Sequence, residues 1–127
     1  MKFSVLASGS KGNSCYFQTE HARILIDGGL SCRETERRLH SVGVEANSLD
    51  ALILTHEHGD HMKGAGPLAR RFGLPVYSSR KTFDRGRKAL GNIERPVVIQ
   101  TGQTLTINDL MVETFTKCHD AADPFGV

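Results

Sequence analysis

The stretch that decides the fold is Ala51-Leu52-Ile53-Leu54-Thr55-His56-Glu57-His58-Gly59-Asp60-His61. Its first four residues are apolar, which is typical of a short strand buried on both faces of a sheet. Three histidines and one aspartate follow at once. Imidazole nitrogens and carboxylate oxygens are the usual ligands of zinc and related divalent metals. The sequence therefore predicts a metal site at the end of a buried strand.

The spacing of these ligands indicates two adjacent ions. His56 and His58 are two residues apart, so an extended or turning backbone places both rings on one side. Asp60 and His61 follow where a helix is expected to begin. Two ions about 3.5–4 Å apart stabilise both the attacking and the leaving oxygens of a displacement, and metal binding lowers the pKa of bound water to about 7. The pattern predicts a hydrolase that uses a metal-bound hydroxide, rather than a histidine-rich surface loop or a closed structural site.

Composition favours a single globular domain. The chain has 127 residues, of which 39% are hydrophobic and 24% charged, and its net charge is +2, so bulk charge does not by itself indicate a nucleic-acid partner. Cys15, Cys32 and Cys118 are odd in number and widely spaced, which favours a reduced, cytoplasmic setting. No apolar stretch approaches the roughly 20 residues that cross a bilayer, so no membrane partner is expected.

The order of periodic segments predicts a mixed α/β (α+β) domain with helices packed on a sheet. Ser31 and Glu34 form a capping box at the start of one expected helix. Strands are expected at 2–7, 14–19, 22–27, 51–55, 76–77, 97–100, 104–107 and 111–116, and helices at 31–42, 62–72 and 81–90.

Residues 55–61 resemble the HxHxDH signature of the metallo-β-lactamase superfamily. The resemblance implies that Asp27, which ends an apolar strand and precedes two glycines, orients a ligand histidine. It also implies that His119 completes a three-histidine site with His56 and His58. Asp60, besides binding metal, would help to orient the nucleophile. Zinc is the expected ion, with manganese as the alternative.

Two further segments resemble the YycJ-type (WalJ-like) members, which are related to ribonucleases J and Z. They are residues 6–14 and the motif 119–124. This resemblance implies a nuclease that cleaves phosphodiester bonds of nucleic acid, as a 5′-to-3′ exonuclease on DNA. Ser8, Ser10 and Asn13 would line the substrate cleft, the alternative being a tight turn between strands. The basic stretch 80–88 is either a surface that follows a phosphate backbone or a solvated helix face.

The resemblance also implies a missing half. The family fold is a four-layer αββα sandwich, in which a later aspartate and a last histidine complete the second metal site. No histidine follows His119 in this sequence. Residues 1–127 are therefore expected to be the N-terminal half of a truncated domain, holding one ion or none where the intact enzyme holds two. We expect the fragment to be inactive and to self-associate through an exposed sheet face.

Two other functions stay open. A glyoxalase-type thioester hydrolase shares the same histidine-rich core motif, and a truncated metal-binding module without catalytic activity would need no further ligands.

Overall fold

The fold is built on a six-stranded mixed sheet. The computed structural model describes residues 2–9, 12–55, 59–100, 102–113, 115–116 and 125–126, and the side chains of these except at 59, 60, 115, 116, 125 and 126. The strand order is β1-β2-β3-β4-β5-β6, antiparallel from β1 to β3 and parallel from β3 to β6. The carboxyl ends of β3 to β6 therefore lie at one edge of the sheet. The strands are β1 (Lys2–Ala7), β2 (Ser14–Gln18), β3 (Arg23–Ile26), β4 (Ala51–Ile53), β5 (Val76–Ser78) and β6 (Pro96–Val98).

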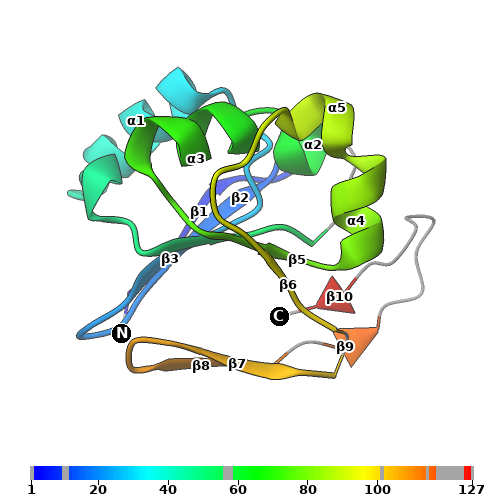
Figure 1. Ribbon diagram of the computed structural model, residues 1–127. Coiled ribbons are helices and arrows are strands. Elements are labelled where there is room, and N and C mark those ends of the chain that lie inside the picture. Colours follow the sequence, from blue (N-terminus) through cyan, green and yellow to red (C-terminus); the bar gives the residue numbers. More distant parts are fainter. Residues whose placement is uncertain are drawn as a thin grey trace.

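Helices cover one face of this sheet (Figure 1). They bury a core of leucines and a methionine, in which Leu25 and Leu52 from the sheet meet Leu39, Met62 and Leu68 from the helices. Each of these side chains is fully buried, which makes this cluster the main hydrophobic contribution to stability. The helices are α1 (Cys32–Ser41), α2 (Gly59–Met62), α3 (Ala65–Phe72), α4 (Arg80–Arg85) and α5 (Arg87–Leu90), with a 3₁₀ turn η1 (Ala46–Ser48) after α1.

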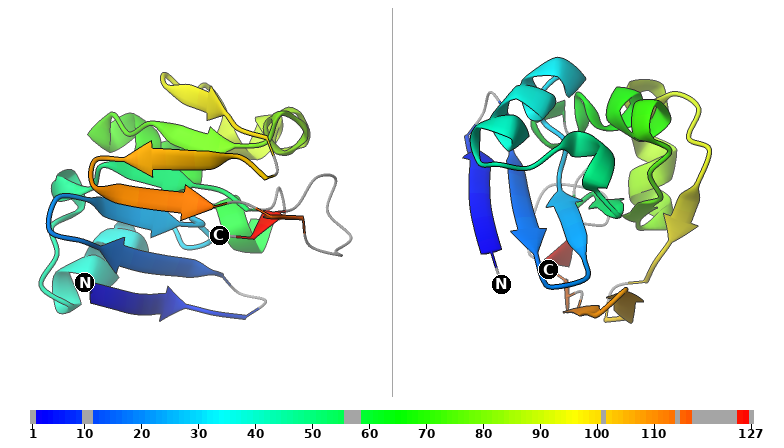
Figure 2. Two further views of the ribbon diagram at one scale, coloured as in Figure 1. Left: turned by 90° about the horizontal axis from the view of Figure 1, so that it is seen from below. Right: turned by 90° about the vertical axis from the view of Figure 1, so that its left-hand side faces the viewer.

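A hairpin lies against the opposite face of the sheet (Figure 2). Its strands β7 (Thr104–Ile107) and β8 (Leu110–Glu113) alternate exposed and buried residues, as expected for a half-buried hairpin. Leu105 and Val112 pack with Ile24 and Ile53 of the sheet in a second apolar cluster. Two short strands, β9 (Phe115–Thr116) and β10 (Phe125–Gly126), pair with each other.

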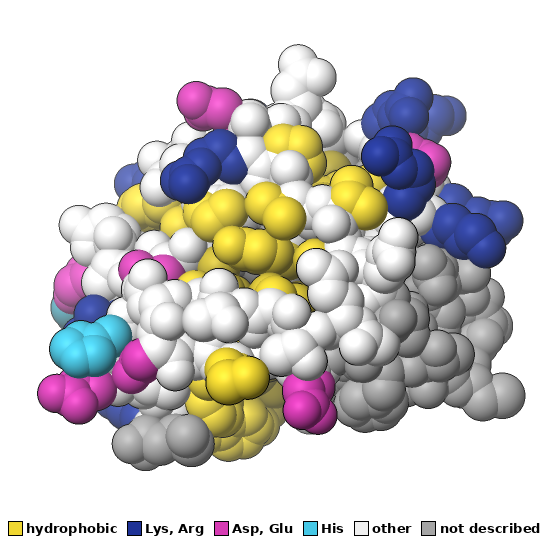
Figure 3. Space-filling view, turned by 60° about the horizontal axis from the view of Figure 1, so that its bottom comes forward, with side chains coloured by type: hydrophobic (Ala, Val, Ile, Leu, Met, Phe, Trp, Pro, Cys, Tyr) yellow, Lys and Arg dark blue, Asp and Glu magenta, His cyan; other side chains and the backbone are white. Residues whose placement is uncertain are grey.

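Between the sheet and this hairpin an apolar groove of about 600 Å³ stays open. Phe3 and Phe17 form one wall, with their rings edge to face at 6.0 Å, and Met111 stands on the other side. Figure 3 shows hydrophobic side chains on the surface of this side of the molecule. The exposed apolar sheet face expected from the sequence is therefore present, although the hairpin covers part of it.

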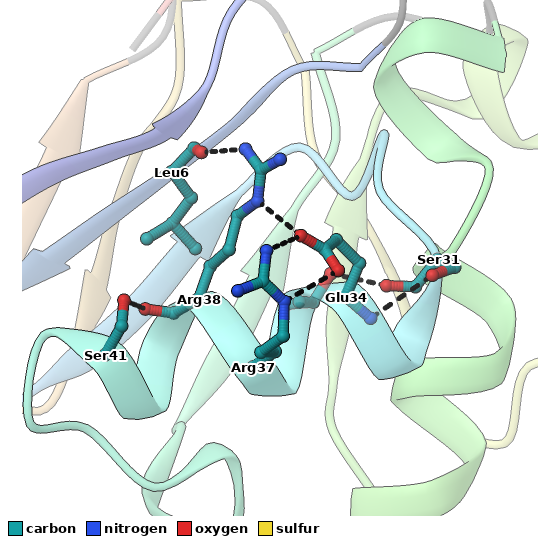
Figure 4. A network of polar contacts seen from close by, with 7 residues as sticks. Leu6, Ser31, Glu34, Arg37, Arg38 and Ser41 are labelled. Carbon is teal, nitrogen blue, oxygen red and sulfur yellow. Dashed lines mark hydrogen bonds and ion pairs between the residues drawn. The ribbon is translucent and has the colours of Figure 1, made fainter.

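Helix α1 is tied to the edge strand β1 by a polar network (Figure 4). Ser31 caps the helix, because its Oγ accepts a hydrogen bond from the Glu34 N–H at 3.2 Å. The Glu34 carboxylate pairs with both Arg37 and Arg38, and Arg38 also donates to the Leu6 carbonyl at 2.6 Å. The Ser31 half of the expected capping box is confirmed. The Glu34 carboxylate bonds the two arginines instead of the Ser31 N–H.

Two helices expected as single segments are each broken at a glycine. The segment 62–72 divides at Gly64, where a Cβ atom would lie 1.8 Å from the Leu30 carbonyl oxygen. The segment 81–90 divides at Gly86, where a Cβ atom would lie 2.7 Å from the Met62 side chain. At Gly64 the close backbone approach requires a residue without a side chain, whereas at Gly86 the end of the flexible Met62 side chain would have to shift. Within the expected strand 111–116, the structure describes β8 up to Glu113 and β9 over Phe115–Thr116.

Candidate metal centre

The candidate centre begins at the carboxyl edge shared by β3 and β4. These strands pair in parallel with Ile26 opposite Ile53, so the residues that follow them, Asp27 and Thr55, come close together. The Asp27 N–H donates to the Ile53 carbonyl at 2.7 Å and extends the ladder by one residue. In open α/β sheets this edge is where ligands bind.

Asp27 has a left-handed backbone, with φ at 65°. Aspartate tolerates this region better than most residues because its short side chain bonds locally. The left-handed turn ends the strand, and the Ser14 hydroxyl donates to the Asp27 carbonyl at 2.8 Å. A buried residue in an uncommon conformation, held by neighbours from two strands, is typical of a functional position.

The Asp27 carboxylate is the centre of a compact polar cluster. Its Oδ1 accepts the Thr55 N–H at 2.8 Å, and the Thr55 hydroxyl lies 2.9 Å from Oδ1 and 2.7 Å from Oδ2. Its Oδ2 also lies 2.8 Å from Nδ1 of His61. Asp27 is 7% exposed, so these bonds are largely protected from solvent. Such charge-assisted bonds are stronger than neutral ones.

Backbone bonds hold His61 in this position. Gly28 N–H donates to the His61 carbonyl at 2.6 Å, and Gly64 N–H donates to the Gly28 carbonyl at 2.7 Å. The turn after β3 is thus bonded to both α2 and α3. A Cβ atom on Gly28 would lie 3.1 Å from Ala65, so this close approach also depends on glycine. His61 is therefore held in place through its backbone carbonyl as well as through its ring.

This arrangement suits a metal-binding imidazole. A carboxylate only accepts hydrogen bonds, so the proton of the His61–Asp27 bond belongs to Nδ1 and the lone pair belongs to Nε2. A carboxylate partner on the far nitrogen is the usual companion of a ligand histidine, because it fixes the tautomer and raises ligand basicity. The donor chemistry at this edge therefore fits a divalent metal.

The loop before β2 also reaches this edge. Asn13 closes the loop, since its Nδ2 donates to the Gly9 carbonyl at 2.8 Å and its Oδ1 accepts from the Gly9 N–H at 3.2 Å. Its own carbonyl accepts the Gly29 N–H at 2.9 Å. The loop containing Ser8 and Asn13 therefore lies beside the turn that carries Asp27. Both expected readings, a tight turn and a cleft wall, remain compatible with this position.

Several expected site residues lie outside the described residues. They are His56, His58 and His119, together with Ser10 of the loop, and the side chain of Asp60, whose backbone belongs to α2. Within the described part of the chain, no three His, Cys, Asp or Glu side chains gather into a metal site. Of the expected residues the structure brings together Asp27 and His61. Sequence reasoning used Thr55 only as a mark of the family and missed Ser14, which no local pattern distinguishes from other strand residues.

Comparison with known proteins gives the family. The profile of the metallo-beta-lactamase superfamily matches residues 8–116. The chain belongs to the metallo-β-lactamase superfamily. Among solved members, the Rm3 metallo-beta-lactamase superposes with a TM-score of 0.78 at 19% identity, over 92% of this chain and 50% of that one. A likeness at this identity establishes the fold alone.

Sequence relatives within the superfamily are closer. The exodeoxyribonuclease YycJ of Bacillus anthracis is 41% identical over 126 residues, which is 98% of this chain and 48% of the relative. The exodeoxyribonuclease WalJ of Streptococcus pneumoniae is 39% identical over 127 residues, 97% of this chain and 47% of the relative. The expected YycJ-type resemblance is confirmed, and the chain spans about half the length of these curated relatives. Membership of the superfamily also supports a divalent metal cofactor.

Proposed function

We propose that this chain is part of a metal-dependent nuclease that hydrolyses phosphodiester bonds of DNA from the 5′ end. The observation that carries the proposal is the Asp27–Thr55–His61 cluster, in which a carboxylate holds the last histidine of the 55–61 motif. The identity of 41% to an exodeoxyribonuclease supports the choice of DNA. A cytoplasmic location stays a prediction, and no helix in the described residues is both long and apolar enough to cross a membrane.

The residues have distinct roles in this proposal. His56, His58 and His119 bind one metal ion, and Asp60 with His61 contributes to a second site. Asp27 keeps the proton of His61 on Nδ1, and Thr55 holds Asp27 in place. Asp60 orients the attacking water, and the loop with Ser8, Ser10 and Asn13 faces the phosphate. The bound metal supplies Lewis acidity and charge stabilisation, with zinc proposed before manganese.

We propose further that residues 1–127 form the N-terminal part of one domain, and that full activity requires a chain of the relatives' length. The relatives are about twice as long as the matched region, which supports this division. In this reading the fragment binds at most one ion tightly. Two tightly held ions in each isolated chain, found by elemental analysis, would contradict it.

The decisive experiment is a nuclease assay on a chain extended to the relatives' length. A 5′-labelled DNA strand should release its labelled nucleotide early, whereas a 3′-labelled strand should shorten stepwise. Chelation should stop the reaction, and adding back Zn²⁺ or Mn²⁺ separately should identify the ion. His58→Ala should abolish cleavage, and His40→Ala, an exposed histidine of α1, should leave it unchanged. Equal activity of these two variants would contradict the proposed metal centre.

Assays on the same extended chain distinguish the two alternative functions, a thioester hydrolase and a binding module. Hydrolysis of S-lactoylglutathione without DNA cleavage would establish a thioester hydrolase. Metal binding without activity on either substrate would establish a binding module.

We also propose that the isolated chain pairs with a second copy through the apolar groove. Phe3 is 57% exposed and Met111 is 69% exposed beside it, and burial of such surface drives association. Light scattering should show dimers that Phe3→Glu dissociates, while His40→Glu on the helical face has no effect. A wild-type chain that stays monomeric at high concentration would contradict this proposal.

A further inference from the structure

Positive charge is concentrated on one short part of the fold. Residues 80–88 contain five basic side chains and one acidic one, a net charge of +4, although the whole chain carries only +2. These residues form α4 and α5, and all five basic side chains are exposed. Figure 3 shows Lys and Arg side chains gathered at one end of the molecule. Charge separated in this way attracts a polyanion better than the small net charge suggests.

The two helices also enclose a pocket. It has a volume of about 430 Å³ and lies between α4, α5 and the edge strand β6. Its lining combines apolar side chains with two arginines; the lining includes Arg80, Phe83, Asp84, Arg87, Ile93 and Val98. Val98 is 43% exposed on the open edge of the sheet, and Phe83 is partly buried. The pocket thus joins an aromatic and aliphatic surface to cationic groups.

The guanidinium groups at the pocket are available to a ligand. Arg87 lies 3.5 Å from the Asp84 carboxylate, a long and exposed pair of little strength. Arg80 makes no ion pair with any described residue, and neither do Lys81, Arg85 or Lys88. The Asp84 carboxylate adds two acceptor oxygens, which suit the amino groups of nucleobases.

One wall of the pocket, helix α4, begins at the carboxyl ends of the parallel strands, where the candidate metal centre lies. Helix α4 starts two residues after β5 ends, and β5 is the parallel neighbour of β4. The Ser78 hydroxyl donates to the Leu54 carbonyl at 2.9 Å, which fixes the start of α4 beside the strand that leads into residues 55–61. A DNA strand bound at the pocket can therefore extend along α4 toward the 55–61 motif.

We propose that the α4–α5 pocket binds a nucleotide of single-stranded DNA, with the base against Phe83 and Val98 and the adjoining phosphates on Arg80 and Arg87. The proposal rests on the proposed nuclease function, and it adds a substrate contact away from the scissile bond. Proteins that hold single strands commonly combine aromatic stacking with a basic groove. A base pocket favours single strands, because the bases of a duplex are stacked and paired.

The first test is DNA binding by the 127-residue chain in EDTA, where no cleavage is needed. Fluorescence anisotropy follows a labelled oligothymidylate of about 12 nucleotides. Arg80→Ala with Arg87→Ala should weaken binding at least about fivefold and reduce the slope of log K against log salt by about 1.4, or 0.7 for each phosphate contact. The matched control is Arg71→Ala with Arg95→Ala. Arg71 lies in the last turn of α3, and Arg95 accepts a bond from the first residue of β5 through its carbonyl. Both lie toward the amino ends of the parallel strands, and neither lines the pocket.

The second test separates base from phosphate. Phe83→Leu should weaken binding of oligothymidylate by about fivefold or more but leave binding of an abasic strand unchanged. If Phe83→Leu does not fold, as judged by circular dichroism, Val98→Gln at the exposed edge replaces it. Equal losses on the normal and abasic strands would overturn the base pocket. Equal losses in the two arginine pairs, or no binding by the wild-type chain, would overturn the whole proposal.

These outcomes are independent of the catalytic test. Equal binding losses in the pocket and control variants, with intact cleavage by the extended chain, would overturn only the pocket proposal. Pocket-dependent binding without any metal-dependent cleavage would remove only the nuclease function.

Discussion

The Nδ1 atom of His61 lies 2.8 Å from Oδ2 of Asp27, although the two residues are 34 positions apart in the sequence. The parallel pairing of β3 with β4 brings them together, and bonds through Gly28 and Gly64 hold the turn against α2 and α3. The pair links the fold of the first sheet to the chemistry proposed for its edge. Stability and metal binding are therefore expected to depend on the same carboxylate.

Asp27→Asn should destabilise the metal-free chain by about 1–3 kcal/mol. Asparagine tolerates the left-handed backbone, so the substitution tests the side chain rather than the turn. Its amide places an N–H donor where one carboxylate oxygen stood, so Thr55 and the Nδ1–H of His61 no longer have an acceptor oxygen each. Urea denaturation measures the loss, and Asp84→Asn on exposed α4 should change stability little. A variant as stable as the wild type would show that the cluster does not support the fold.

The same variant should bind metal about 10–100-fold more weakly in a chain of the relatives' length. Competition with a chelator measures this affinity. The ¹⁵N shifts of His61 should show a proton on Nδ1 in the wild type and a mixture of tautomers in Asp27→Asn. Identical shifts in both proteins would mean that Asp27 does not set the tautomer.

Gly64→Ala should cost about 3 kcal/mol or more, because the new Cβ atom would meet the Leu30 carbonyl oxygen at 1.8 Å. Gly73→Ala is the matched comparison. Gly73 has φ at 62° with no atom within 4 Å of its Cβ position, so alanine there costs only the backbone strain of about 1 kcal/mol. Similar losses in the two variants, measured by urea denaturation, would contradict the close approach at Leu30.

Glu34 should make stability sensitive to acid. Hydrogen bonds from Arg37 and then Arg38 lower the pKa of its carboxyl from 4.5 to about 2. Since the folded pKa is the lower one, the stabilisation is complete above pH 4.5 and is lost as the pH falls toward 2. The difference in urea midpoint between wild type and Glu34→Gln should therefore shrink across this interval. A Glu34 difference that stays constant with pH would contradict the assignment.

Asp109 should hold the β7–β8 hairpin to the main sheet. Its carboxylate accepts the Thr19 hydroxyl and the His21 N–H, and the Thr19 bond is the main reason why the pKa of Asp109 is lowered. Asp109→Ala should therefore speed amide exchange at Leu105 and Val112, and lowering the pH through the pKa of the carboxyl should loosen the hairpin in the wild type. Exchange that is unchanged in the variant would show that apolar packing alone holds the hairpin.

Much of the fold could be predicted because it is encoded locally. The apolar run Ala51–Leu54 marked the buried strand, and Ser31 marked the start of α1 through its own cap. The breaks at Gly64 and Gly86 could not be predicted, because each depends on a carbonyl or a side chain distant in sequence. Glu34 shows the same limit. Its carboxylate was expected to accept the Ser31 N–H, but it bonds Arg37 and Arg38, one turn further along the helix.

The candidate site divides in the same way. The sequence by itself determined the histidine-rich motif 55–61, the family and the place of Asp27 at a strand end, since these depend on residue chemistry and short spacing. Only the tertiary structure decided which histidine Asp27 holds, that Thr55 and Ser14 fix it, and that α4, α5 and β6 form a basic, partly apolar pocket. The physical reason is strand pairing: the neighbours of a β-strand residue across the sheet are set by register, which no local pattern contains.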